Sequence, residues 1–308
     1  MSALDAMAFG VQVAGVGLAP LLPGGVQATK ARLQGRRGPG LLQPYRELRR
    51  LWRRSAVDPV GAGVVYRLAP PLVAAALALC LLVVPVATRG TGWPAGHDVI
   101  VVVGLLALAR VVIALSAWDT GGGFGLMGAS RDLTFAILGE ALLVLVALLA
   151  SLPAGSTDLR AIWSASAGAG IWAEPAHWCG ALAMGLVVLL ETGRQPIDNP
   201  DTHLELTMIH EGPLLEYAGR DLAFLQWAAA ARHWVVLVLA AGLFMPHPEG
   251  LGPGLAALAA SLVVLAAALG FVETWQAKMR LLRVPALLLA GAGVALLGLV
   301  SWVAGGAA

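Results

Sequence analysis

One feature of this chain recurs and fixes its fold class: apolar segments of about 20 residues, each long enough to cross a lipid bilayer as a helix. Because the bilayer core offers no water to backbone N–H and C=O groups, such segments fold as α-helices. The sequence predicts eight spans, at residues 6–25, 68–87, 99–117, 133–152, 172–190, 224–244, 254–272 and 285–304. We therefore expect an all-α polytopic membrane protein that forms a single integral membrane domain over residues 1–308.

Composition agrees with this fold class and excludes several functions. Hydrophobic residues make up 58% of the chain and charged residues 12%, about half the charged share of soluble domains. A net charge of +2 gives no indication of a nucleic-acid partner. Cys80 and Cys179 lie in apolar runs, without the Cys/His spacings of zinc, iron–sulfur or haem sites. We expect no metal site, no bound cofactor and no catalytic residue.

The basic residues predict an orientation in the membrane. Residues 30–67 hold ten of the twenty Lys and Arg residues. If this segment is cytoplasmic, alternation of the spans places loops 118–132, 191–223 and 273–284 on the same side. That side then carries sixteen Lys and Arg residues and the opposite side two. Cytoplasmic loops of membrane proteins carry an excess of Lys and Arg, so we expect the main basic and acidic loops in the cytoplasm.

The first long loop carries a predicted amphipathic helix with a basic face. Apolar and aromatic residues recur at helical spacing over residues 41–54, with arginines between them. Residues 30–54 contain nine Lys and Arg residues against one carboxylate, Glu47. This charge predicts a docking surface for a soluble partner; the alternative is attraction to anionic lipids of the bilayer. The candidate docking residues are Arg36, Arg37, Arg46, Arg49 and Arg50.

Residues 191–221 form the longest polar segment between two predicted spans. They contain seven carboxylates and two arginines. Asn199-Pro200 predicts the start of a short helix, because Asn caps helices and Pro tolerates the first helical position. Gly212-Pro213 is expected to kink or end that helix. The segment is either a solvated acidic loop or a functional one at the membrane edge, and its carboxylate density favours function.

Charges also occur within the predicted spans. Arg110, Glu140 and Arg232 lie deep, and a lone charge there costs at least ~3 kcal/mol, so each should face a partner or a wet cavity. Arg110 and Glu140 each lie about eight residues from the cytoplasmic end of consecutive spans, which predicts a pair; Arg232 is the alternative partner. Such pairs can simply fix helix packing. For Glu140 we favour a proton-relay role.

The remaining ionisable residues complete a candidate proton path. Glu191 and Glu273 lie at the cytoplasmic rim of their spans and adjoin the acidic segment. Histidine is the side-chain type that titrates near neutral pH, so His210 could shuttle protons, although a lone His is more often a helix-surface residue. The predicted path comprises Glu140, Glu191, Asp198, Glu205, Glu211, Glu216, Glu273 and His210, with Arg110, Arg194 and Arg232 as charge partners.

Several motifs resemble one family along nearly the whole chain. They include RRGPG at 36–40, YRLAP at 66–70, ETGRQPID at 191–198 and THLELTMIHE at 202–211. These motifs are similar to those of formate hydrogenlyase subunit 4 and hydrogenase-4 component C. Both are membrane subunits of energy-converting [NiFe] hydrogenases, homologous to subunit 1 of respiratory NADH–quinone oxidoreductase.

This resemblance implies a role and a set of partners. It implies a non-catalytic subunit of an oxidoreductase complex in a bacterial-type cytoplasmic (inner) membrane, without a redox centre of its own. It implies docking under the small iron–sulfur subunit and the large [NiFe]-hydrogenase subunit. It also implies antiporter-like membrane subunits as neighbours, reached by a path of carboxylates.

Two other functions remain as alternatives. One is a component of a quinone-reducing NADH dehydrogenase-type complex, similar to its subunit 1. The single Gly-Pro unit in GPGLLQP, at residues 38–44, and the sequence THLEL, at 202–206, depart from quinone-reducing relatives and favour the hydrogenase branch. The other is a stand-alone ion transporter, which the absence of an internal repeat in the sequence disfavours.

Overall fold

The computed structural model describes residues 3–86, 96–198 and 209–306 of the chain. These residues form helices and turns, with one isolated bridge between Asp98 and Asp158. The helices are α1 (Ala3–Leu18), α2 (Leu21–Leu33), α3 (Gln43–Trp52), α4 (Val64–Val83), α5 (Val99–Thr120), α6 (Gly123–Ser151), α7 (Leu159–Ser166), α8 (Pro175–Glu191), α9 (Gly219–Phe244), α10 (Leu251–Trp275) and α11 (Val284–Gly306). Four short 3-10 turns join them: η1 (Leu152–Ala154), η2 (Ala169–Ala173), η3 (Gly212–Leu214) and η4 (Leu281–Arg283).

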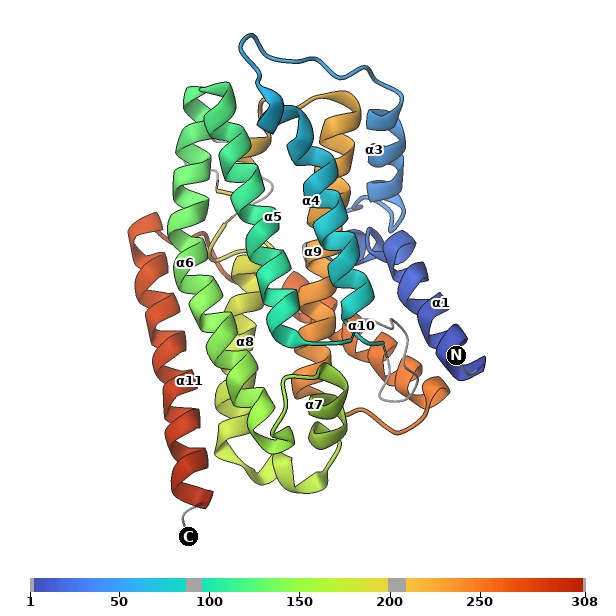
Figure 1. The fold of residues 1–308 in the computed structure, drawn as a ribbon, viewed down its shortest axis with the longest axis vertical. Helices are drawn as coiled ribbons and strands as arrows, with labels where there is room; N and C mark the ends of the chain where they lie inside the picture. The colour runs from blue at the N-terminus through green and yellow to red at the C-terminus, as the bar shows by residue number, and fades with distance from the viewer. Residues whose placement is uncertain (1–2, 87–95, 199–208, 307–308) are drawn as a thin grey trace.

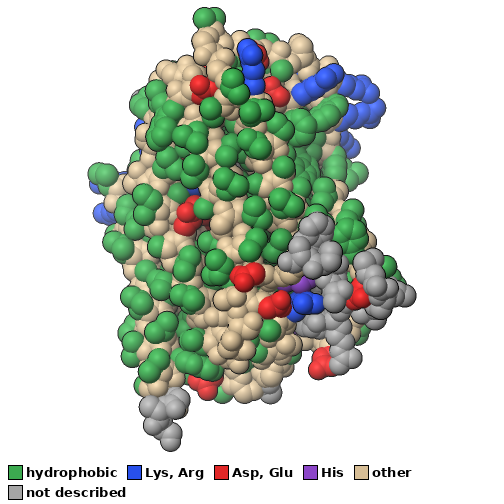
Figure 2. Space-filling model, viewed as in Figure 1, with side chains coloured by type: hydrophobic (Ala, Val, Ile, Leu, Met, Phe, Trp, Pro, Cys, Tyr) green, Lys and Arg blue, Asp and Glu red, His purple; other side chains and the backbone are tan. Residues whose placement is uncertain are grey.

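The long helices pack side by side into one bundle, with α9 inside and α11 at its edge (Figure 1). In α9, 72% of the apolar 18-residue stretch is buried inside the protein, whereas the corresponding share of the helix that contains α11 is 22%. The protein is therefore an all-α polytopic membrane protein, as the sequence predicts. Hydrophobic side chains cover the outer face along the length of the bundle, as Figure 2 shows, which is the surface expected toward lipid.

The predicted number of eight spans is not confirmed. Among the described residues, six helices are long and apolar enough to cross a membrane: α4, α5, α6, α9, α10 and α11. The pair α1 and α2 makes a seventh if the two helices form one span. The predicted span 172–190 corresponds to α8, which begins at Pro175 and has 17 residues. Residues 172 and 173 belong to the turn η2 instead.

The predicted first span, 6–25, is wrong as a continuous helix. α1 ends at Leu18, α2 begins at Leu21, and the two helices bend by 54°. Pro20 is the N-cap residue of α2, and its ring and missing N–H disfavour an uninterrupted helix through this position. α2 then continues to Leu33, so Lys30 lies on a helix rather than in the predicted loop.

The predicted loop 118–132 is also mostly helical. α5 continues to Thr120 and α6 begins at Gly123, so two residues connect them. Gly121 adopts φ 67°, a left-handed conformation that glycine reaches without strain. The tight connection makes α5 and α6 an antiparallel hairpin, which brings charges on the two helices to similar depths.

The predicted amphipathic segment 41–54 contains the helix α3. Its residue Leu51 is buried, and the helix packs on α9 beside the upper ends of α4 and α9 in Figure 1. The predicted helix starting at Asn199-Pro200 lies outside the described residues. At Gly212-Pro213, where we expected an interruption, the chain forms the turn η3.

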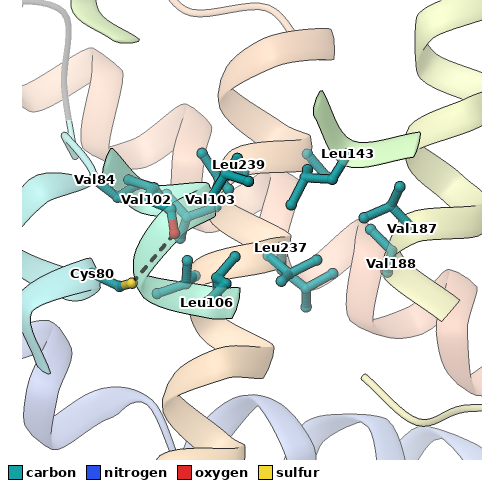
Figure 3. Close-up of a cluster of buried hydrophobic side chains, with 14 of the residues drawn as sticks. Cys80, Val84, Val102, Val103, Leu106, Leu143, Val187, Val188, Leu237 and Leu239 are labelled. Atoms are coloured by element: carbon teal, nitrogen blue, oxygen red, sulfur yellow. Dashed lines mark hydrogen bonds between the residues drawn. The ribbon is translucent and has the colours of Figure 1, made fainter. Parts of the chain in front are cut away.

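The core of the bundle is built from aliphatic side chains of α4, α5, α6, α8 and α9 (Figure 3). Leu106, Leu143, Val187 and Leu237 are almost completely buried there. Cys80 donates through its Sγ to the carbonyl oxygen of Val102, 3.8 Å away, and fills space as a small apolar side chain. The continuous apolar core fixes the helix positions around the charged groups described below.

Small residues allow the helices to approach closely. A Cβ added at Gly242 of α9 would overlap the indole ring of Trp163, which is fully buried on α7. No side chain larger than hydrogen fits beside this indole unless α7 shifts. The contact therefore fixes the short helix α7 against the central helix.

We expect Gly242→Ala to destabilise the purified protein by about 1–3 kcal/mol, because overpacking forces the neighbouring backbone or side chains to move. The measurement is the thermal unfolding midpoint in detergent. Gly104→Ala is the matched control, since a Cβ there meets nothing within 4 Å. Equal midpoints for the two variants would contradict the close packing of α7 on α9.

Candidate functional site

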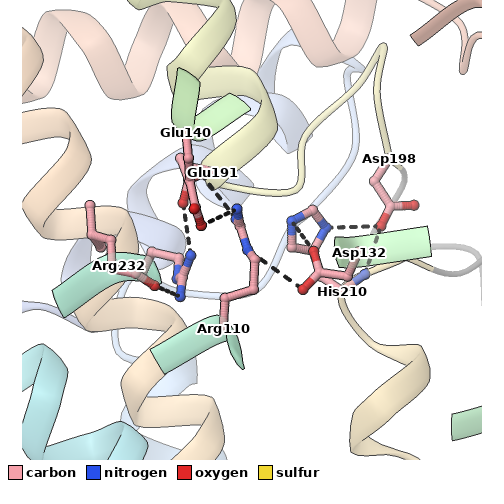
Figure 4. A network of polar contacts seen from close by, with 8 residues as sticks. Arg110, Asp132, Glu140, Glu191, Asp198, His210 and Arg232 are labelled. Carbon is pink, nitrogen blue, oxygen red and sulfur yellow. Dashed lines mark hydrogen bonds and ion pairs between the residues drawn. The ribbon is translucent and has the colours of Figure 1, made fainter. Parts of the chain in front are cut away.

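Four helices of the bundle each bring a charged side chain to one buried point (Figure 4). Glu191, the last residue of α8, accepts from two arginines. Its Oε1 lies 3.0 Å from Nη2 of Arg110 on α5, and its Oε2 lies 2.8 Å from Nη1 of Arg232 on α9. The side chains of Arg110 and Glu191 are only 2% and 1% exposed. These hydrogen bonds satisfy both carboxylate oxygens within an apolar bundle.

Arg110 faces two further carboxylates, both on α6. Its Nε lies 3.6 Å from Oδ2 of Asp132, and its Nη1 lies 3.5 Å from Oε1 of Glu140. With Arg232, two cations therefore meet three carboxylates, a net charge of −1 when all five are ionised. Glu140 has 28% of its side chain exposed, so it is the member of this cluster most open to its surroundings.

The predicted pair of Arg110 and Glu140 is thus present, but the nearer partner of Arg110 is Glu191. Arg232, which we considered as the partner of Glu140, pairs with Glu191 and also donates through Nη2 to the carbonyl oxygen of Leu106, 3.1 Å away. The positions of the charges along their helices predicted that they meet. They did not predict that a carboxylate at the end of α8 would lie between the two arginines.

His210 extends the cluster into the acidic segment. Its Nε2 lies 3.7 Å from Oδ1 of Asp132, and its Nδ1 lies 3.3 Å from Oδ2 of Asp198. Lys278, in the loop before α11, donates through Nζ to Oδ1 of Asp198, 2.9 Å away. A series of charged or titratable side chains therefore runs from Arg232 through Arg110 and His210 to Lys278.

Asp198 is held in its ionised form. Burial raises the pKa of this carboxyl, but hydrogen bonding to His210 and Lys278 outweighs burial and holds the pKa well below its ordinary value. Asp198 therefore stays ionised around neutral pH and orients the imidazole of His210. Gly193 permits this arrangement: it adopts φ 60°, and a Cβ there would lie 3.1 Å from Nδ1 of His210.

A second buried cluster lies beside the first. Glu273 on α10 accepts from Nη1 of Arg194, 3.0 Å away, and its other oxygen lies 3.7 Å from Nζ of Lys30 on α2. Arg194 follows α8 directly, so this cluster ties α2 and α10 to the start of the acidic segment. The backbone N–H of Met279 also donates to the carbonyl oxygen of Pro196, 2.8 Å away.

The other predicted path residues lie outside these contacts. Glu205 lies outside the described residues. Glu211 is half-buried and lines a cavity of about 550 Å³, which Arg194 and His233 also line. Glu216 is half-buried, and its backbone carbonyl accepts from the Tyr66 hydroxyl, 2.8 Å away.

A smaller cavity opens directly on the charged network. It has a volume of about 130 Å³, room for several water molecules. Its charged or titratable lining residues are Arg110, Asp132, Glu191, His210 and Arg232. Water in this space could bridge the gaps of 3.6 and 3.7 Å that separate Asp132 from Arg110 and from His210.

The five predicted docking arginines are exposed. Arg36 and Arg37 lie in the connection between α2 and α3, and the other three lie on α3. Basic side chains gather at the upper right of Figure 2, where Figure 1 places α3. The described residues contain no group of three or more His, Cys, Asp or Glu side chains that could hold a metal ion.

Sequence reasoning missed Asp132 and Lys278 as members of the network. Asp132 precedes the predicted span 133–152, so we assigned it to a loop. It lies eight residues before Glu140, which places both carboxylates on one face of α6 about two turns apart. That spacing was a usable signal. Lys278 offered none, since a basic residue in a short loop is common.

The geometry defines a polytopic membrane protein with a buried, laterally extended charge network. The sequence profile of the family described as NADH dehydrogenase matches residues 7–303. Hydrogenase-4 component C of Escherichia coli is 36% identical over 94% of this chain and 92% of that protein. Formate hydrogenlyase subunit 4 of the same organism is 33% identical over 93% of this chain and 95% of that protein.

The chain belongs to the NADH dehydrogenase family, and the predicted resemblance to formate hydrogenlyase subunit 4 and hydrogenase-4 component C is confirmed. A solved structure of the membrane-bound sulfane sulfur reductase, an archaeal respiratory membrane complex, contains a chain of the same fold. The TM-score is 0.81 at 21% identity, covering 96% of this chain and 98% of that one. The relatives of this chain therefore include subunits of multi-subunit membrane complexes.

We expect a double-mutant cycle to rank the partners of Arg110. Glu191→Gln should destabilise the purified protein by about 3–5 kcal/mol, because it leaves buried arginines without their carboxylate. Glu140→Gln should destabilise it less, since Glu140 is partly exposed and lies farther away. The measurement is the unfolding midpoint in detergent, for the single variants and for the double variants with Arg110→Gln. Additive effects of Arg110→Gln and Glu191→Gln would contradict the pair.

Proposed function

We propose that this chain is the membrane-anchoring and proton-path subunit of an energy-converting [NiFe] hydrogenase complex of the formate hydrogenlyase type. It would dock a soluble redox arm, the large [NiFe] subunit and the small iron–sulfur subunit, on the cytoplasmic side of a bacterial-type inner membrane. The observation that carries the proposal is the network from Arg232 to Lys278, which joins the membrane bundle to the acidic segment. The full-length similarity to two hydrogenase-complex subunits supports the type of complex.

His210 is the proposed point of proton transfer within the network. Its two ring nitrogens face different carboxylates, Asp132 and Asp198, so the imidazole can accept a proton on one side and release it on the other. Asp132 then adjoins Arg110, whose guanidinium also faces Glu140. A proton arriving near Asp132 changes the charge balance around Arg110 and so favours proton exchange at Glu140.

Glu140 is the proposed exit from this chain. Its partial exposure distinguishes it from Glu191, which is buried and doubly hydrogen-bonded. In this proposal Glu191 holds the two arginines in place, and Glu140 passes protons toward an antiporter-like neighbour. The exposed apolar surface of the long helices provides room for such neighbours in the membrane.

One observation favours a second candidate function, that of a component similar to subunit 1 of a quinone-reducing complex. The cavity of about 550 Å³ is within the range of small-molecule sites, and it combines apolar walls with Arg194, Glu211 and His233. Hydrogen-dependent reduction of an added quinone by the purified complex, blocked by Ala230→Trp in the cavity wall, would support this candidate. Quinone-independent turnover at the unmodified rate would support the hydrogenase assignment.

We expect Arg36→Glu combined with Arg37→Glu to release the soluble hydrogenase subunits while the protein stays in the membrane. Reversing two charges replaces attraction by repulsion at an exposed docking surface. The measurement is the amount of large [NiFe] subunit that co-purifies after mild detergent extraction. Arg160→Glu, on α7, is the control because the predicted topology places it on the opposite side. An arm that stays bound and active places docking elsewhere.

We expect His210→Gln to preserve assembly and impair coupled turnover. Glutamine keeps hydrogen-bonding capacity but cannot carry a proton between its two ends at neutral pH. Assembly is followed by co-purification, and coupling by proton movement into inverted membrane vesicles during hydrogen evolution. Glu249→Gln, an exposed carboxylate between α9 and α10, should behave as the unmodified chain. Loss of the assembled complex in the His210 variant would assign the residue a structural role.

A further inference from the structure

An apolar groove lies between α3, α4 and α9, away from the charged network. Its volume is about 430 Å³, and all nine lining residues are apolar. The rings of Trp52 on α3 and Phe224 on α9 form one wall, in an edge-on contact with centroids 5.2 Å apart. Trp227 also lines the groove, and its indole N–H donates to the carbonyl oxygen of Val16, 3.0 Å away. The groove is therefore built from ordered aromatic side chains.

The groove opens toward the surface that faces lipid. α4 contributes Pro71 and three alanines to its wall, and Pro71 and Ala75 are exposed. Leu68, Leu72 and Leu79 are exposed along the same helix and form a stripe suited to hydrocarbon. A lipid acyl chain can therefore enter the groove directly from the bilayer, without passing a polar barrier.

The same helix α3 carries uncompensated positive charge beside the groove. Five arginines, on α3 and at the two positions after it, line a hollow: Arg46, Arg49, Arg50, Arg53 and Arg54. Arg50 pairs with Glu47. In the parts of the chain that the structure describes, the other four form no ion pair with a carboxylate. Four such guanidinium groups attract an anionic group and repel a cationic one.

Two of these arginines lie about 100° round the helix from residues that line the groove. Leu48 and Trp52 line the groove, and Arg49 and Arg53 each follow one of them by a single position. Arg53 is the C-cap residue of α3 and has a helical backbone conformation, so its side chain lies above that of Arg49, four residues earlier, at the end of the helix. Two neighbouring guanidinium groups can bind the oxygens of one phosphate with several charge-assisted hydrogen bonds.

We propose that this groove binds one phospholipid with an anionic headgroup, whose phosphate lies on Arg49 and Arg53 and whose acyl chain lies against Trp52, Phe224 and Trp227. The site requires both parts, the charge pair and the apolar groove. The lipid would fill the space between α3, α4 and α9 and hold α3 against the bundle. This proposal assigns Arg49, one of the candidate docking residues, to the lipid and leaves the proposed docking of the soluble arm to Arg36 and Arg37.

The test measures lipid retention by the full chain, purified with the subunits that accompany it in mild detergent. Native mass spectrometry counts bound lipid after addition of phosphatidylglycerol or phosphatidylcholine. We expect one phosphatidylglycerol to be retained in preference to phosphatidylcholine. Arg49→Gln combined with Arg53→Gln should weaken this retention roughly tenfold or more, the scale expected for losing hydrogen bonds to a charged group.

Two matched pairs of variants separate the site from general effects. Arg280→Gln with Arg283→Gln removes the same charge at two exposed positions outside the groove and outside the proposed docking surface, and should leave retention unchanged. Ala75→Phe fills the groove and should reduce retention, whereas Ala259→Phe, on the exposed face of α10, should not. These variants keep every group of the charged network.

Three results would overturn the proposal. Equal retention of the two lipids would show that headgroup charge is not recognised. Equal loss in the Arg280/Arg283 control would show that basic residues attract anionic lipid in general and that the groove adds nothing. Release of the soluble subunits from the Arg49/Arg53 variant, with lipid retention unchanged, would make these arginines part of a protein docking surface. Lipid retention is measured without proton coupling, so failure of the proposed function leaves this result unaffected.

Discussion

Glu191 and its two arginines are the contact on which the rest of this structure depends. Each of the three groups would be strongly unfavourable alone within an apolar bundle, and each becomes tolerable only when the other two are in place. α5, α8 and α9 must therefore pack in one register, with Arg110, Glu191 and Arg232 at the same depth. Hydrophobic contacts in the aliphatic core are non-directional and tolerate small shifts of these helices. The hydrogen bonds of Glu191 depend on distance and angle and tolerate much smaller shifts. Polar groups here specify the arrangement that hydrophobic burial stabilises.

In the proposed proton path, the uneven number of charges around Arg110 is what would allow the cluster to take up a proton. Three carboxylates share two arginines, so one negative charge is left over when all are ionised. An additional proton can balance this charge without disrupting the hydrogen bonds of Glu191. The carboxylates thus differ in burial and pairing: some hold the arginines in place, whereas the Glu140 side chain stays partly exposed. This division follows from geometry, since the residue types are the same.

Hydropathy was sufficient to predict the fold class and most helices, because each apolar segment carries its own signal. Pro20 could have indicated the break between α1 and α2, but it lies within an apolar run long enough to be predicted as one span. The helical loop 118–132 was missed for the opposite reason: its polar residues look like a loop, although the charges of Asp132 and Arg131 lie on a continuous helix. Side-chain partners were harder still. Arg110 and Glu191 are separated by 81 residues, and no local pattern reports such a contact. Glu205 and the helix expected from residue 199 remain predictions.

The loop before α11 has a consequence for how motion can pass through the protein. It is fastened to the acidic segment twice, through Lys278 to Asp198 and through the backbone of Met279 to Pro196. α11, the most peripheral long helix, begins at Val284, a few residues later. A neighbouring chain that pulled on α11 would therefore pull on the carboxylate that aligns His210. The outermost helix is therefore linked through one short loop to the carboxylate that aligns His210, in addition to its direct packing on α6 and α8.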